Sequence, residues 1–241
     1  MIRKRLSSFQ DVDLYCVTAK PREGQTHEGL VESACRGGAD IIQLRDKTLS
    51  PKDFISLGRA LKKVCDQYGA LFIVNDRVDV ALACDADGVH VGQDDVPVAV
   101  ARQILGHRKI IGCSTHSLQQ AFQAETAGAD YVSCGPLFAT PTKPDYAPVG
   151  LDSVRHYRNV LHIPFVAIGG IDASNVEAVI NAGADRAAVV RAVFDQDDVE
   201  GAARSLKETI RKAKSRRSSV EKTRMLDRQV SGIAEDRPFS D

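Results

Sequence analysis

Short apolar runs rich in β-branched residues alternate with amphipathic stretches along most of this sequence. Eight such runs can be counted, and a helical periodicity follows them most clearly at 51–69, 117–127, 173–182 and 198–214. Strands alternating with helices predict βαβ units and a parallel sheet, and eight units in this length predict a closed barrel. We therefore expect an α/β fold of the (β/α)8 TIM-barrel type. The expected strands lie within 14–19, 41–46, 71–76, 88–93, 109–115, 131–137, 164–170 and 186–193.

A Gly-Ala-Asp motif recurs just before three of the expected strands. It occurs as Gly-Gly-Ala-Asp at 37–40 and as Ala-Gly-Ala-Asp at 127–130 and 182–185. Glycine at this place ends a helix in the left-handed conformation and lets the chain turn into the next strand. Any α/β protein does the same, so the repeat defines element borders and carries no functional meaning.

Length and charge pattern divide the chain into a barrel and a tail. The 241 residues suit one α/β barrel, which we assign to residues 1–214. Residues 215–241 contain SRRSS, scattered charges and no sustained apolar period. Because such a segment buries too little surface to offset the entropy of ordering, we expect a mobile, charged and solvated tail.

Composition excludes several classes of protein. The 32 basic and 32 acidic residues cancel, which argues against nucleic acid as the main partner. No apolar run approaches the roughly 20 residues of a membrane span, and no apolar stretch follows the basic start as in a secretory signal. The six cysteines are scattered without a CxxC motif, so we expect buried thiols in a reducing cytoplasm. The oligomeric state, including a homo-oligomer, stays open.

The end of the second expected strand carries two cations. In this fold the active site lies at the carboxyl ends of the strands. Side chains alternate along a strand, so Gln43, Arg45 and Lys47 share one face while the apolar neighbours take the other. The apolar face must meet the helices, which turns the polar face toward the barrel mouth. Two cations there indicate that an anion binds between them.

Two acidic positions follow the third and fourth expected strands. Asn75 and Asp76 end one strand, and Asp95 lies just beyond the other, ahead of Pro97. Each could cap the helix that follows it. Two carboxylates on neighbouring strand ends beside a basic pair nevertheless favour a hard cation, because Mg²⁺ takes one or two carboxylates together with substrate phosphate oxygens.

Two histidines lie near the mouth. His116 follows Ser114 at the end of the fifth strand, and we interpret it as a surface residue in the first turn of a helix. A hydroxyl residue here, Ser114, Thr115 or Ser117, could cap that helix. His90 lies between two valines in the fourth strand, so we expect a packed, hydrogen-bonded histidine in place of a general base.

The last three strand ends suggest a place for phosphate. The long loop 135–150 contains Thr140, Thr142 and Lys143 among four prolines, which stiffen it and favour a substrate cover. Gly170 ends the seventh strand, and glycine lets backbone approach an anion closely. Loops after strands seven and eight commonly cradle phosphate in this fold through backbone N–H groups.

Six motifs, in this order and at similar spacing, resemble the thiamine phosphate synthase family. They are QLRDK (43–47), VNDR (74–77), GVHVGQDD (88–95), GCSTHS (112–117), GPLFATPTK (135–143) and AIGGI (167–171), and the resemblance extends over about residues 13–214. Members of this family condense 4-amino-2-methyl-5-hydroxymethylpyrimidine pyrophosphate with 4-methyl-5-(2-hydroxyethyl)thiazole phosphate, giving thiamine monophosphate and pyrophosphate. The resemblance therefore implies a Mg²⁺-assisted transferase that follows a dissociative path on small-molecule substrates.

The resemblance also implies a role for each matching residue. Asp76 and Asp95 would hold Mg²⁺ on the pyrophosphate. Gln43 would contact the pyrimidine, and Ser114 would lie near the reacting centre. The pyrophosphate would be bound, and its developing charge stabilised, by Arg45, Lys47, Asn75 and Lys143. The thiazole phosphate would be bound by Thr140, Thr142, Gly170, Val190 and Arg191.

One position departs from the family pattern, and two related functions compete. Arg191 stands where the family often has a small hydroxyl residue, which puts the detail of the thiazole-phosphate pocket in question. A thiazole tautomerase with the same barrel would need a proton-transferring histidine such as His116, but tends to lack the full set of cations and carboxylates. A barrel that only binds thiazole phosphate as a regulator would show an incomplete set. Because the set is complete here, the synthase is favoured over both.

Overall fold

Eight parallel strands form a closed barrel in which each strand pairs with its neighbours in sequence and β8 pairs with β1. This computed structural model describes the backbone of residues 9–141 and 146–235, and the side chains as far as Thr223 apart from that of Gln10. All eight strands fall within the runs expected from the sequence, which confirms the (β/α)8 fold. They are β1 (Leu14–Val17), β2 (Ile41–Leu44), β3 (Leu71–Asn75), β4 (Gly88–Val91), β5 (Ile110–Thr115), β6 (Tyr131–Cys134), β7 (Phe165–Ile168) and β8 (Ala187–Val189).

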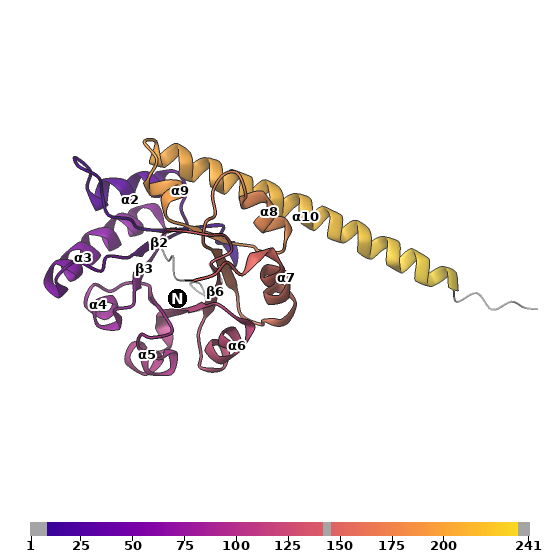
Figure 1. The fold of residues 1–241 in the computed structure, drawn as a ribbon, viewed down its shortest axis with the longest axis horizontal. Coiled ribbons are helices and arrows are strands. Elements are labelled where there is room, and N and C mark those ends of the chain that lie inside the picture. The colour runs from indigo at the N-terminus through magenta and orange to yellow at the C-terminus, as the bar shows by residue number, and fades with distance from the viewer. Residues whose placement is uncertain (1–8, 142–145, 236–241) are drawn as a thin grey trace, which may run out of the picture.

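Helices surround the barrel and fill the connections between its strands (Figure 1). The four clearest expected helices correspond to α3, α6, α8 and α10, with borders shifted by at most three residues except at the end of α10. The helices are α2 (His27–Arg36), α3 (Pro51–Tyr68), α4 (Val78–Ala83), α5 (Val98–Leu105), α6 (Leu118–Thr126), α7 (Gly150–Val160), α8 (Val176–Asn181), α9 (Arg191–Phe194) and α10 (Val199–Glu235), with 3-10 turns η1 (Phe9–Asp11) and η2 (Gly106–Arg108). No helix in the described part of the chain is long and apolar enough to cross a membrane.

Side chains alternate between two apolar layers, as the pleat of a strand requires. Ile42 and Leu44 face outward and belong to the large core between strands and helices. A smaller core inside the barrel contains the rings of Tyr15 and Tyr131. Phe9 enters from the amino end of the strands and stacks on Tyr131, with ring centroids 4.7 Å apart. The amino end is therefore filled, and the opposite end is left to form a site.

Aspartates at the amino ends of the strands tie the barrel together. Asp40 directly precedes β2, and its Oδ2 accepts hydrogen bonds of 3.0 Å from the backbone N–H groups of Asp13 and Leu14. Asp130 precedes β6 and accepts from the N–H of Ile111 at 2.7 Å. Both aspartates belong to the Gly-Ala-Asp repeat, in which Gly38, Gly128 and Gly183 all have positive φ as expected. The repeat thus does more than mark borders, because its carboxylates satisfy N–H groups of the adjacent strand.

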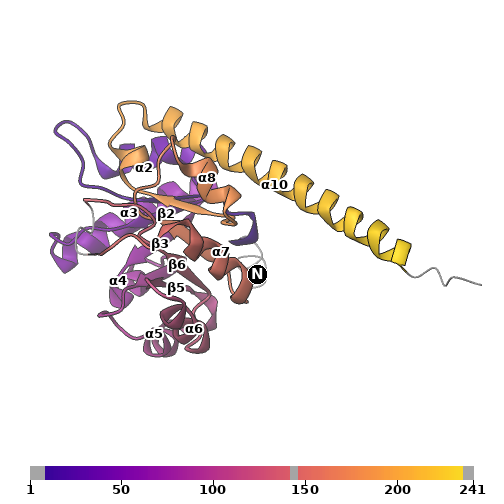
Figure 2. The same cartoon turned by 45° about the vertical axis from the view of Figure 1, so that its right-hand side comes forward.

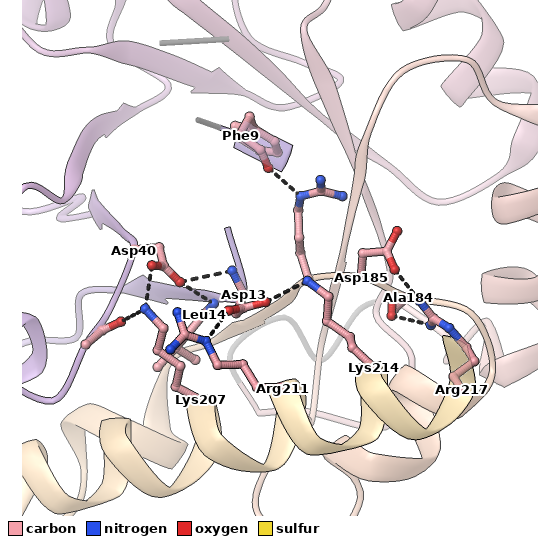
Figure 3. A network of polar contacts seen from close by, with 12 residues as sticks. Phe9, Asp13, Leu14, Asp40, Ala184, Asp185, Lys207, Arg211, Lys214 and Arg217 are labelled. Carbon is pink, nitrogen blue, oxygen red and sulfur yellow. Dashed lines mark hydrogen bonds and ion pairs between the residues drawn. The ribbon is translucent and has the colours of Figure 1, made fainter. Parts of the chain in front are cut away.

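Helix α10 extends well past the barrel in both views (Figures 1 and 2). Its inner part supplies cations to the aspartates at the amino ends of the strands, as Figure 3 shows. Lys207 pairs with Asp40, and Asp13 receives Arg211 Nε at 2.8 Å and Lys214 Nζ at 2.6 Å. Burial raises the pKa of Asp13, but its bonds to the two cations outweigh burial, and the net pKa is lowered.

The border expected at residue 214 lies inside helix α10, and the division into a barrel of residues 1–214 and a tail of residues 215–241 stays a prediction. Helix α10 continues without a break to Glu235, and the first turns beyond Lys214 contact the barrel. Arg217 donates to the carbonyl oxygens of Ile180 and Ala184 and pairs with Asp185. These contacts are polar, so a search for apolar periodicity could not reveal them. The mobility expected for residues 215–241 stays a prediction.

We expect the extension to contribute to stability. A chain ending at Lys214 loses the bonds of Arg217 and the pair between Arg216 and Glu177. Such bonds contribute about 1–3 kcal/mol in total when one partner is half-buried. The unfolding midpoint in urea of the chain that ends at Lys214 should therefore fall below that of a control chain that ends at Thr223. Equal midpoints for the two chains would show that the turns between Lys214 and Thr223 only rest on the barrel.

Candidate active site

A cavity of about 420 Å³ opens at the carboxyl ends of the strands. Side chains from most strands and the loops after β6, β7 and β8 line it. Of the residues singled out in the sequence, those that line it are Gln43, Arg45, Asn75, His90, Ser114, His116, Thr140, Gly170, Val190 and Arg191. These residues lie at the strand ends where they were expected, whereas Lys47, Asp76 and Asp95 are not among the lining residues, and the roles of all of them stay predictions.

A chain of hydrogen bonds crosses the floor of the cavity. Gln43 Nε2 donates to the hydroxyl of Tyr15 at 2.7 Å, and that hydroxyl lies 2.9 Å from the hydroxyl of Tyr131. The Tyr131 hydroxyl lies 2.9 Å from His90 Nδ1, and His90 Nε2 lies 2.9 Å from Ser114 Oγ. His90 is thus the packed, hydrogen-bonded histidine that was expected. The floor connects β2, β1, β6, β4 and β5 through polar atoms.

The two tyrosines of this chain of hydrogen bonds were not singled out from the sequence. Tyr15 and Tyr131 are buried, and desolvation raises the pKa of each phenol above its ordinary value. Gly112 makes room for the second ring, since a Cβ at that position would lie 2.1 Å from Cζ of Tyr131. The available signal was the position of each tyrosine in its strand. That position points the ring into the barrel, where the buried hydroxyl needs a hydrogen-bond partner.

On the basic side of the mouth, Gln43 and Arg45 point inward as expected, but Lys47 does not line the cavity. Gln43 is buried inside the barrel, Arg45 lines the cavity, and Lys47 reaches outward at the rim. The side chain of Lys47 is 67% exposed, and its Nζ lies 3.9 Å from Asp76 Oδ2. Arg45 belongs to none of the described ion pairs, although its charge acts on Asp76, so this side of the mouth can attract an anion.

The two predicted metal ligands lie together. Burial, followed by a hydrogen bond to Asp95 and its charge, raises the pKa of Asp76 to about 6. Asp95 is anchored by Gly92, whose N–H donates to Oδ2 at 2.7 Å. Asp76 itself has a φ of 60°, in the left-handed region, and its N–H donates to the His90 carbonyl at 2.8 Å. Strain of this kind is held in place by surrounding structure and often marks functional positions.

Of the helix-cap alternatives, the structure shows only the one at the start of α6. Helix α4 has Arg77 at its N-cap and α5 has Pro97, and neither receives a side-chain cap bond. Helix α6 is capped by Ser117, which accepts from the N–H of Gln120 at 3.2 Å, so Ser114 and Thr115 do not cap it. The polar residues at these strand ends are left for the cavity.

His116 is not the surface residue of a first helical turn that was expected. It precedes α6, lines the cavity, and lies 2.6 Å through Nδ1 from the carbonyl oxygen of Gly135. Its ring stacks on Tyr146 with centroids 4.1 Å apart. The β6–α7 connection passes over it and brings Thr140 to the cavity. The predicted residues Thr142 and Lys143 of this connection lie outside the described residues.

The turn after β7 approaches its neighbours too closely for any side chain but glycine. Gly169 and Gly170 have φ values of 100° and 64°, and a Cβ on Gly170 would lie 2.7 Å from Cβ of Phe138. Backbone is thereby exposed to the cavity beside Val190 and Arg191. Arg191 is exposed, and its charge lowers the pKa of Asp172, after larger effects of hydrogen bonds from Ser174.

This combination defines a class of protein. The mouth of a closed parallel barrel combines a cavity that has a basic side and a glycine turn with a carboxylate pair beside it, which is how barrel enzymes bind and transform phosphorylated substrates. Among the residues that the structure describes, no group of three metal-ligating side chains occurs, so the carboxylate pair would need ligands from a substrate to hold a cation.

Comparisons with known proteins identify the family. Residues 14–193 match the family model described as thiamine monophosphate synthase. The chain is 50% identical to the thiamine-phosphate synthase of Chloroflexus aurantiacus over 204 residues, which cover 84% of this chain and 94% of that one. It is 48% identical to the thiamine-phosphate synthase of Thermosynechococcus vestitus over 205 residues, which cover 85% of this chain and 58% of that one. The solved thiamine phosphate pyrophosphorylase from Pyrococcus furiosus superimposes with a TM-score of 0.79 at 39% identity, over 85% of this chain and 98% of the other. The chain belongs to the thiamine monophosphate synthase family.

Proposed function

We propose that this protein condenses the pyrimidine pyrophosphate and the thiazole phosphate named above to thiamine monophosphate, releasing pyrophosphate. The observation that carries the proposal is the pairing of Asp76 with Asp95 directly beside Lys47 and Arg45. Two carboxylates and two cations at one side of a cavity suit a diphosphate with a bound cation. Family membership supports the same reaction, and neither a tautomerase nor a regulator needs this arrangement.

The carboxylate pair fits Mg²⁺. Burial and, after it, the hydrogen bond to Asp95 and its charge raise the pKa of Asp76 to about 6, and a divalent cation held by the two carboxylates would favour the ionised form of Asp76. The hydrogen bond from Gly92 holds Asp95 in place for this role. Bound Mg²⁺ would stabilise the negative charge of the diphosphate. We propose Asp76 and Asp95 as its protein ligands, completed by substrate oxygens and water.

The other residues of the cavity would divide between the two substrates. Arg45 and Lys47, with Asn75 and Lys143, would bind the pyrophosphate, and Gln43 would contact the pyrimidine ring. Opposite them, the backbone at Gly170 and Val190 would meet the thiazole phosphate. Arg191 and the two threonines Thr140 and Thr142 would complete that subsite.

The reaction needs charge stabilisation more than proton transfer. As the bond between the pyrimidine methylene carbon and the pyrophosphate oxygen breaks, the electron pair leaves with pyrophosphate, where Arg45 and Lys47 stabilise it. The ring amino group stabilises the resulting cation. The thiazole nitrogen then forms the new C–N bond with its lone pair, and no proton has to be removed. Cations at one side of the mouth are suited to this path.

Replacing Lys47 by alanine should slow the reaction about tenfold to a hundredfold, because one charge that stabilises the leaving group is lost. Lys47 is mostly exposed, so the change should leave the thermal midpoint unchanged. Steady-state kinetics with varied pyrimidine pyrophosphate measure the first effect, and Lys52→Ala on the outer surface of α3 is the matched control. Wild-type turnover in Lys47→Ala would remove this residue from the site.

A direct assay tests the proposed function. Purified protein is incubated with both substrates and Mg²⁺, and thiamine monophosphate is measured with and without EDTA. Product that disappears with EDTA is expected. A folded protein that binds thiazole phosphate but yields no product would favour the tautomerase or the regulator. We also propose a cytoplasmic location, which the six free buried thiols support.

A further inference from the structure

The hydrogen-bonded floor of the cavity has a direction. Burial raises the pKa of Tyr15 and of Tyr131, so each phenol keeps its proton and has one hydrogen to donate. Gln43 donates through Nε2 to Tyr15, whose oxygen is thereby an acceptor. The Tyr15 hydrogen must then go to Tyr131 at 2.9 Å, because that is its other hydrogen-bonded neighbour on the floor.

The same reasoning continues to the far end. Tyr131 accepts from Tyr15 and donates its hydrogen to His90 Nδ1 at 2.9 Å. Because Nδ1 accepts this bond, the ring N–H of His90 lies at Nε2, which is 2.9 Å from Ser114 Oγ. Ser114 accepts that hydrogen bond. Its own hydroxyl hydrogen is left for an acceptor in the cavity that it lines.

The two ends of this chain of hydrogen bonds, Gln43 and Ser114, present an acceptor and a donor to the same cavity. At the β2 end the amide nitrogen of Gln43 is used by Tyr15, so its carbonyl oxygen is available to accept from a ligand. At the β5 end Ser114 is a donor. The intervening groups are buried, with exposed fractions of 2% at Tyr15, 0% at Tyr131 and 7% at His90, so water cannot easily exchange their partners. In such an environment hydrogen bonds are strong and an unmatched group is costly.

We propose that Tyr15, Tyr131 and His90 are positioning residues, which transmit the orientation of the Gln43 amide across the barrel and set Ser114 as a hydrogen-bond donor to the substrate. This inference rests on the proposed function for what the donor serves. Pyrophosphate oxygens gain negative charge as the C–O bond breaks, and a donor fixed beforehand requires no reorganisation at that moment. The Gln43 carbonyl would accept from the amino group of the pyrimidine.

The tautomer of His90 tests the polarity without any substrate. Protein labelled with ¹⁵N-histidine is examined by NMR, and the His90 resonances are assigned by their loss in His90→Asn. A neutral ring protonated at Nε2 is the expected result. A ring protonated at Nδ1, or at both nitrogens, overturns the proposal whether or not the protein makes thiamine monophosphate.

Kinetics test whether the chain of hydrogen bonds acts through Ser114. Tyr15→Phe removes the hydroxyl that orients Tyr131, and we expect kcat to fall about tenfold with little change in KM. In a Ser114→Ala background the same change should have no further effect on kcat, because the group that it positions is absent. Equal losses in both backgrounds would overturn the proposal, and inactivity of the wild type would contradict the proposed function instead.

Tyr157 provides the matched control. It is also a buried tyrosine, but its hydroxyl bonds to Thr115 Oγ1 at 3.0 Å and to the Ser117 carbonyl at 2.9 Å, away from the floor. Tyr157→Phe should lower the thermal midpoint about as much as Tyr15→Phe and leave the His90 tautomer unchanged. A loss of Nε2 protonation in Tyr15→Phe but not in Tyr157→Phe supports the chain. If Tyr15→Phe leaves both kcat and the tautomer at wild-type values, the chain does not transmit orientation.

Discussion

Replacing Asp76 by asparagine is expected to lower turnover about a hundredfold or more while leaving the barrel folded. The change removes one of the two carboxylates that would hold Mg²⁺ on the pyrophosphate, and electrostatic stabilisation of a leaving group is commonly worth this much. The amide keeps the size of the side chain. Initial rates over a range of Mg²⁺ concentrations measure the effect, and excess Mg²⁺ should recover only part of it.

Asp79 serves as the control for Asp76. It lies in the first turn of α4, is 66% exposed and pairs with Arg77, so Asp79→Asn changes the same chemical group outside the cavity. We expect its rate to stay within about twofold of wild type, since exposed pairs contribute little. If Asp76→Asn and Asp79→Asn have equal rates, Asp76 does not hold the metal.

The same substitution should stabilise the metal-free protein at neutral pH. The pKa of Asp76 rises from 3.8 to about 6 on folding, so the folded state favours the protonated form. In the wild type, the contribution of protonated Asp76 to stability is present below pH 3.8 and is lost as the pH rises through about 6. In EDTA, the thermal midpoint of Asp76→Asn relative to wild type should therefore be higher at pH 7.5 than at pH 4.5. A difference that does not change with pH would mean that burial and Asp95 do not destabilise the ionised form of Asp76.

Replacing Asp40 by alanine is expected to have the largest effect on stability, about 3–5 kcal/mol in the free energy of unfolding. The change leaves the N–H groups of Asp13 and Leu14 without their acceptor. It also leaves the ammonium group of Lys207, whose side chain is 14% exposed, without its carboxylate. In a domain of this size such a loss lowers the thermal midpoint by about 10 °C. Differential scanning calorimetry measures it, and activity below the transition should be retained because Asp40 lies at the opposite end of the barrel from the cavity.

Asp152 provides a matched change on the surface. It pairs with Arg155 on α7, and its side chain is 85% exposed. Asp152→Ala should change the free energy of unfolding by less than about 1 kcal/mol. If Asp40→Ala is no more destabilising than this control, the network of Figure 3 does not hold the strands to α10.

Local pattern was sufficient for the fold. Each strand is buried on its outward face and each helix covers it, so periodicity and the Gly-Ala-Asp turns locate all eight units. The tail shows the limit of this approach. Residues 215–223 contact the barrel through charged side chains, and the partners of Arg216 and Arg217 are more than 30 positions away in sequence. Charge alone does not tell which distant carboxylate an arginine meets.

The sequence by itself determined the barrel, the end at which the site lies, and the residue types at its rim, because alternation along a strand and the position of a strand end are local properties. Only the tertiary structure decided how those residues combine. It placed Asp76 against Asp95, moved His116 from a helix surface to the cavity, and joined Tyr15 to Tyr131 across 116 residues. The reason is physical: closing the barrel brings strand ends that are distant in sequence within hydrogen-bonding distance, and burial there gives each polar group one set of partners.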